Sequence, residues 1–156
     1  MSRFARAFVF GVALLAASAA AAATQVARSI PIAPGAGATP QVQQECQLQT
    51  LVPQAIQAAG GDVTLVDGKP QGRWLELSIS EVHAPGGGLF SGPKWITVSG
   101  KLHDRGKLIG SFRAKRISTA AKSTCGTLAR VATAIGQDIA AFLQAPSMNA
   151  EIGDAR

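Results

Sequence analysis

Alternating apolar and polar positions in the middle of the chain predict β-strands. In the longest run Leu75, Leu77 and Ile79 are separated by polar residues. Such period-two alternation is typical of an antiparallel sheet that has one face on a core and one face in water. The pattern predicts a meander of about four strands. These strands are Val63–Val66, Arg73–Val82, Lys94–Leu102 and Leu108–Ile117.

The first stretch with helical spacing runs from Leu48 to Ala59, where two glycines end it. Pro53 is tolerable there if Thr50 is the N-cap, because Pro53 then falls in the first turn, where a backbone N–H has no partner. The pattern leaves residues 42–49 open to either an extended or a helical conformation.

The second apolar stripe runs from Cys125 to Leu143 and predicts an amphipathic helix of about five turns. Ser123 or Thr124 is its expected N-cap. Two helices that bracket a meander favour the α+β class. The expected architecture is a two-layer sandwich with both helices packed on one face of the sheet.

The first residues of the chain have the pattern of a secretory leader. Arg3 and Arg6 precede an apolar run from Phe8 to Ala17, and small residues follow up to Ala23. The alternative is a membrane anchor, but the strongly apolar run is about half of the roughly 20 residues that cross a bilayer. We expect cleavage near Ala23, and export to the periplasm or the medium.

Composition divides the rest of the chain into three parts. Residues 24–40 are rich in alanine, glycine and proline and are expected to form a flexible linker. Residues 41–145 are expected to form a single α+β domain, and residues 146–156 a loose tail. No second long apolar stretch follows, so no transmembrane segment is expected after cleavage.

The two cysteines, Cys46 and Cys125, are expected to form a disulfide, since an even count is typical of exported chains. The alternative is a metal site completed by His83 and His103, the only histidines. No motif for a cofactor is recognised.

The modest positive charge of the chain bears on the kind of partner. Removing Arg3 and Arg6 with the leader leaves 13 basic against 9 acidic residues. This balance favours contact with an anionic envelope surface or an acidic partner protein, and export makes nucleic acid an improbable partner.

Two surfaces are candidates for binding. The glycine-rich stretch His83–Pro93 carries Leu89 and Phe90, which either contact a partner or fold back onto the edge of the core. Basic side chains on the polar phase of the predicted strands either bind an anionic partner or protect the sheet from aggregation. These basic candidates are Lys101, Arg113 and Lys115.

No catalytic residue is predicted. His103 beside Asp104 is a nominal base, but neighbours in a strand point to opposite faces. We therefore expect a non-enzymatic periplasmic binding or accessory protein. The alternatives are an envelope hydrolase that uses His103 or His83, and a small-ligand carrier with an apolar cavity between sheet and helices.

Several segments resemble an uncharacterised family of small exported bacterial envelope domains. They are Leu75–Ile79, Gly92–Lys94, the turn Asp104–Lys107 leading to Phe112, and the closing helix Cys125–Leu143 with Gly136, Gln137 and Asp138. The resemblance covers about Cys46 to Leu143 and implies an accessory or assembly role in the cell envelope. It carries no catalytic residue.

Overall fold

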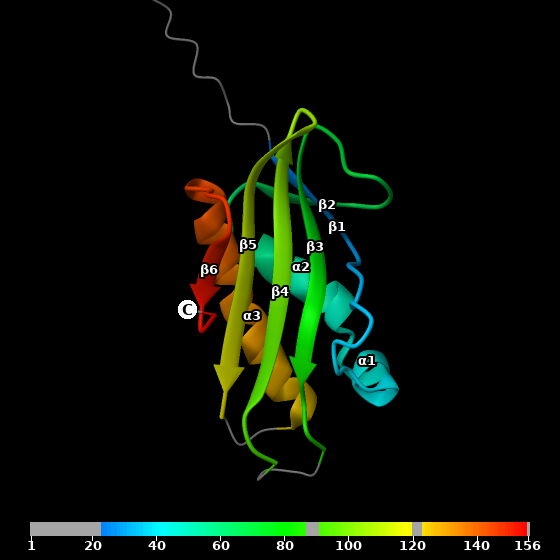
Figure 1. Ribbon diagram of the computed structural model, residues 1–156. Coiled ribbons are helices and arrows are strands. Elements are labelled where there is room, and N and C mark those ends of the chain that lie inside the picture. Colours follow the sequence, from blue (N-terminus) through cyan, green and yellow to red (C-terminus); the bar gives the residue numbers. More distant parts are fainter. Residues whose placement is uncertain (1–22, 87–90, 120–122, 156) are drawn as a thin grey trace, which may run out of the picture.

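A mixed sheet packs its inner face on helices in the computed structural model, which describes residues 23–86, 91–119 and 123–155. Figure 1 shows the sheet in front of helices α2 and α3. The elements are β1 (Thr24–Ala27), α1 (Pro40–Cys46), α2 (Leu48–Ala58), β2 (Val63–Val66), β3 (Arg73–His83), β4 (Lys94–Asp104), β5 (Lys107–Ser118), α3 (Thr124–Gln144) and β6 (Ala150–Gly153). The α+β class is confirmed.

The described residues form six strands in the order β2-β1-β3-β4-β5-β6. The long strands β3, β4 and β5 make the predicted antiparallel meander. The expectation of about four antiparallel strands was wrong on both sides of this meander, because β1 runs parallel to β2 and β3, and β6 runs parallel to β5. The two added strands have four residues each, too few to show an alternating pattern.

The segment predicted as a linker, 24–40, instead contributes β1 to the interior of the sheet. Val26 is fully buried and Ile30 nearly so. Further along, the backbone N–H of Ala33 donates to the carbonyl of Ile79 at 2.8 Å. A few isolated apolar residues are therefore enough to order this segment. Neighbouring strands supply its hydrogen bonds, and the core buries its apolar side chains.

Helix α2 begins at Leu48, two residues before the expected cap at Thr50, and contains Pro53 in its interior. Proline has no N–H to donate to the carbonyl four residues back, which here belongs to Gln49. That carbonyl accepts instead from the backbone N–H of Ile30 at 3.0 Å. The N-terminal segment thus satisfies the acceptor that Pro53 leaves open, and residues 42–49, left undecided above, are mainly helical.

The expected loose tail, 146–156, is also paired. The backbone N–H of Ser111 donates to the carbonyl of Ser147 at 3.0 Å, and β6 follows along β5. Beyond β6, a carboxylate oxygen of Asp154 accepts from the backbone N–H of Ile117 at 2.9 Å. The C-terminal segment is therefore hydrogen-bonded along the edge of the sheet.

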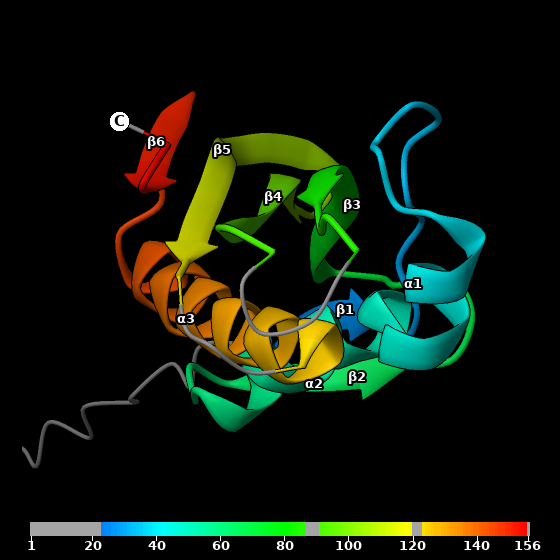
Figure 2. The same ribbon diagram turned by 90° about the horizontal axis from the view of Figure 1, so that it is seen from below.

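Of the two expected N-caps of helix α3, Ser123 is the one observed, and its hydroxyl accepts from the backbone N–H of Gly126 at 3.1 Å. Helix α3 packs against β4 and β5, while α2 packs against α3 and β2, and Figure 2 shows these helices from the end of the strands. Asp138 on α3 accepts two hydrogen bonds of 2.7 Å from Arg116 on β5, which join helix and sheet. No helix among residues 23–86, 91–119 and 123–155 is long and apolar enough to span a membrane.

The predicted disulfide between Cys46 and Cys125 is present, with a Cα–Cα distance of 4.9 Å. It joins the end of α1 to the start of α3. Because both sulfur atoms are in this bond, the alternative of a metal site with thiolate ligands is excluded.

Removing the disulfide is expected to lower the free energy of unfolding by about 2–4 kcal/mol, because a cross-link between residues 79 positions apart restricts the unfolded chain. The measurement is denaturant unfolding of a Cys46→Ser, Cys125→Ser variant in oxidising buffer. Wild-type protein under reducing conditions is the control and is expected to behave as the variant does. An unchanged midpoint would contradict the prediction.

Gly136 sets how closely α2 and α3 approach. A Cβ atom at this position would lie 2.5 Å from the carbonyl carbon and oxygen of Ala55. Gly136→Ala is therefore expected to push the helices apart and to destabilise the protein by about 1–3 kcal/mol in thermal or denaturant unfolding. Gly86→Ala is the matched control, since nothing lies within 4 Å of its Cβ position. Equal stability of the two variants would refute this account of the helix contact.

Candidate functional site

The outer face of β3, β4 and β5, opposite the helices, carries five rows of cross-strand neighbours. Each row takes one side chain from each strand. The rows are Trp74–His103–Leu108, Glu76–Lys101–Ser111, Ser78–Ser99–Arg113, Glu81–Thr97–Lys115 and His83–Trp95–Ile117. Each end row thus holds a tryptophan, a histidine and an aliphatic side chain, and the three middle rows are polar. We call this surface the open face.

A bulge in β3 brings Glu81 onto the open face. The register with β4 shifts between Ile79 and Glu81, so that Val82 rather than Glu81 follows Ile79 into the core. Strict alternation would have sent the Glu81 carboxylate inward. The only sequence signal of the bulge is the spacing of three between the apolar residues Ile79 and Val82.

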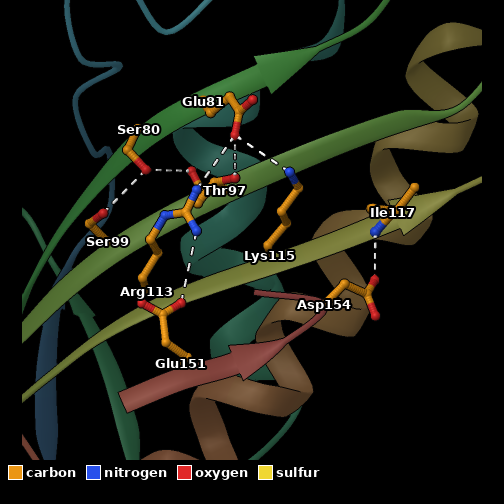
Figure 3. Close-up of polar contacts among 9 residues, drawn as sticks. All are labelled: Ser80, Glu81, Thr97, Ser99, Arg113, Lys115, Ile117, Glu151 and Asp154. Carbon is orange, nitrogen blue, oxygen red and sulfur yellow. Dashed lines mark hydrogen bonds and ion pairs between the residues drawn. The ribbon is translucent and has the colours of Figure 1, made fainter. Parts of the chain in front are cut away.

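Glu81 is the centre of a polar network on this face (Figure 3). Its carboxylate accepts a hydrogen bond of 3.0 Å from the hydroxyl of Thr97. Arg113 and Lys115 each lie 3.8 Å from the same oxygen, and Arg113 also lies 3.8 Å from Glu151 on β6. Two of the three predicted basic residues therefore already have acidic partners.

The pKa of Glu81 lies below its ordinary value. The largest cause is the indole N–H of Trp95, which faces the carboxylate without reaching full hydrogen-bond geometry. Partial burial opposes this by raising the pKa, and the Thr97 hydroxyl, Lys115 and Arg113 lower it further. The ionised carboxylate is thus the form that holds the network together.

Each end of the open face has a stacked tryptophan–histidine pair. Trp74 and His103 have ring centroids 4.3 Å apart, and His83 and Trp95 have centroids 3.7 Å apart. His103 also lies 3.3 Å from Glu76 through Nε2. The imidazoles therefore serve as packing partners of the indoles on this face.

A groove with a volume of about 650 Å³ crosses the open face at the end where Trp74 lies. Its floor is formed by β3, β4 and β5. One wall is the N-terminal segment 27–31, and the other is the segment 148–151. The lining is mostly apolar and includes Leu108 and Met148, whose residues are 43% and 52% exposed.

The structure brings only part of the predicted binding set together. Lys101, Arg113 and Lys115 share the open face, but only Lys101 and Arg113 line the groove. Lys101 makes no ion pair with any residue that the structure describes. Leu89 and Phe90 lie outside the described residues.

The histidines proposed for the hydrolase alternative do not line this groove or the second hollow found between α3 and β6. The groove also differs from the cavity expected for a carrier, because it lies on the open face rather than between sheet and helices. Sequence reasoning missed Trp74, Leu108 and Met148. The one available signal in the sequence was Trp74, a large apolar side chain at a position of the predicted strand that alternation assigns to the polar face.

No protein-family model matches the sequence, and no curated protein matches it. Solved structures with similar folds include a PelC dodecamer variant from Paraburkholderia phytofirmans, at 14% identity and a TM-score of 0.49 over 74% of this chain and 85% of that one. Protein XCC0632 from Xanthomonas campestris, with the family name DUF330, has 13% identity and a TM-score of 0.44 over 74% and 79%. A minor lipoprotein from Acinetobacter baumannii has 16% identity and a TM-score of 0.38 over 78% and 91%.

At these identities the likeness concerns the course of the chain alone.

The Glu81 network is expected to make stability depend on pH in the acid range. A carboxylate with a lowered pKa stabilises the fold above its unfolded-state value of about 4.3, and the stabilisation disappears as the pH falls through the folded-state pKa. Glu81→Gln is therefore expected to be less stable than wild type at pH 7 and to approach it below about pH 4.

Urea unfolding at a series of pH values measures this difference. Glu45→Gln is the control for loss of one negative charge, since Glu45 is bonded to Gln41 on α1, away from the open face. A difference between wild type and Glu81→Gln that stays constant from pH 7 to pH 3 would show that the network contributes nothing through the ionised carboxylate.

Proposed function

We propose that this chain is a non-enzymatic binding protein of the bacterial cell envelope, and that it binds an envelope component in the groove on the open face. The observation that carries the proposal is the groove itself. A volume of about 650 Å³ lies within the range of ligand sites.

The exposed apolar side chains around the groove support binding. Leu108 and Met148 lie in the lining, beside Trp74. Large apolar side chains that gather on a polar surface are a common mark of contact sites. The polar network around Glu81 continues from this lining toward the far end of the face, where Trp95 and Ile117 lie outside the groove.

The chemistry of the groove favours binding over catalysis. Its ionisable side chains are Glu76, Lys101, Arg113 and Glu151, of which Glu76 contacts His103 and Arg113 contacts Glu151. Neither histidine lines the groove. A general acid or base must reach the reacting group within hydrogen-bond distance, and the imidazoles are instead stacked on indoles.

Placement in the envelope rests on the leader pattern and the disulfide. Structural disulfides persist in oxidising compartments such as the periplasm. Cys46 and Cys125 form one in this fold. The proposed location is therefore the periplasm or the medium, with the chain beginning near Thr24 after cleavage.

Site-specific photo-cross-linking in intact cells tests the proposal. Benzoylphenylalanine replaces Leu108 in the groove, or Ile117 at the opposite end of the same face as the matched control. The two residues are 43% and 45% exposed, and Ile117 does not line the groove. After irradiation, the intact mass of the purified protein reports any adduct.

An adduct at position 108 that is absent at position 117 is expected. No adduct at either position, or equal adducts at both, would contradict binding in the groove. The same experiment with a Leu89→Ser, Phe90→Ser variant tests the separate prediction for these two side chains, because a partner contact through them would reduce the adduct yield without any change in the groove.

A further inference from the structure

We propose that the groove binds an apolar monocarboxylate, an unbranched acyl chain that ends in a carboxylate. This inference rests on the proposed function and names the ligand class of the same site. Three features of the lining support it: an ammonium group, a hydroxyl near it and a cluster of apolar side chains.

Lys101 supplies the positive charge for the carboxylate. Its side chain is exposed, lines the groove and makes no ion pair with the described residues. The acids of the lining have other partners: Glu76 lies against His103 and Glu151 against Arg113. The ammonium of Lys101 is therefore the cationic group left for a ligand.

The hydroxyl of Ser78 provides a donor for the same head group. Ser99 precedes Lys101 by two residues on the same face of β4, and its hydroxyl donates to that of Ser80 at 3.2 Å. Ser78 lies opposite Ser99 on β3. Both serines line the groove. An ammonium with a neutral hydroxyl nearby can bind a carboxylate through charge-assisted hydrogen bonds.

The apolar end of the groove lies next to this polar group. The row of Trp74 and Leu108 follows the row of Lys101, about 7 Å further along the strands. Met148 lines the groove from the C-terminal wall, and its unbranched side chain can adapt to a flexible chain. The ligand is thus oriented with its carboxylate at Lys101 and its acyl chain toward Trp74 and Leu108.

The two carboxylates of the lining limit the negative charge that a ligand can carry. Lys101 and Arg113 are matched by Glu76 and Glu151. A dianionic phosphate head would be repelled by Glu76, which lies directly across the strands from Lys101. A monoanion gains the ammonium contact at a smaller cost in repulsion.

The floor of the groove argues against an extended peptide as the ligand. Peptides that bind sheets commonly add a strand to an edge and form backbone hydrogen bonds. Here β3, β4 and β5 pair with one another along the floor, so their backbone groups are already bonded. Recognition is left to side chains, which suits an acyl chain because it has no backbone amides to pair.

Titration of the chain from Thr24 onward with decanoate tests the proposal. The protein has two tryptophans, so a Trp95→Phe background leaves Trp74 as the only indole reporter, and calorimetry supplies the dissociation constant independently. Decylamine and decyl phosphate, used below their micelle concentrations, carry the same chain with a cationic or a phosphate head. Decanoate is expected to bind most tightly of the three.

Two matched pairs of variants locate the contacts. Lys101→Gln and Leu108→Ser are each expected to raise the dissociation constant of decanoate about tenfold. Lys107→Gln and Ile117→Ser are the controls and are expected to leave it unchanged, because neither residue lines the groove. Thermal unfolding of each variant verifies that the fold is retained.

Equal binding of decanoate and decylamine, tighter binding of decyl phosphate, or no effect of Lys101→Gln would overturn the proposal. Failure of decanoate to bind would also overturn it. If the cross-link at position 108 nevertheless forms in cells, the groove binds a different ligand and the proposed function stands. If both experiments fail, the groove is not a binding site.

Discussion

The pairing of the N-terminal strand β1 with two partners is the interaction on which the rest of the structure depends. β1 lies between β2 and β3 and hydrogen-bonds to both. Three residues beyond it, Ile30 satisfies the Gln49 carbonyl that Pro53 leaves free in α2. Without this segment, the sheet would expose the edge of β3 and α2 would contain an unsatisfied acceptor. The segment that follows β1 is also one wall of the groove, so the same part of the chain completes the sheet and forms part of the candidate site.

The elements with strong internal patterns were predictable from the sequence. Alternation located β3, β4 and β5, and the stripe from Cys125 to Leu143 located α3 with its Ser123 cap. The elements that were missed lack such patterns. β1 and β6 have four residues each, and their order comes from neighbouring strands and, for Val26, from burial in the core. A tertiary contact also accommodates Pro53 within α2, which no local rule anticipates.

The candidate site was predictable only in part, because it also depends on contacts between segments that are far apart in the sequence. Alternation placed Lys101, Arg113 and Lys115 on one face, and the structure brings them to that face. Which of them has an acidic partner depends on the bulge that turns Glu81 outward and on β6, which supplies Glu151. The groove needs Met148 and the segment 27–31 as walls, and both lie in parts of the chain whose composition predicted a linker or a tail.

The central claim is that the open face binds its ligand between the segments 27–31 and 148–151, at the end where Trp74 lies. Amide NMR spectra of the chain from Thr24, recorded with increasing decanoate, test this location directly. The account predicts chemical-shift changes that concentrate at Ser78, Lys101 and Leu108, with His83 and Ile117 at the far end unaffected. Changes centred on the helices or on the far end of the open face, or none at all, would contradict it.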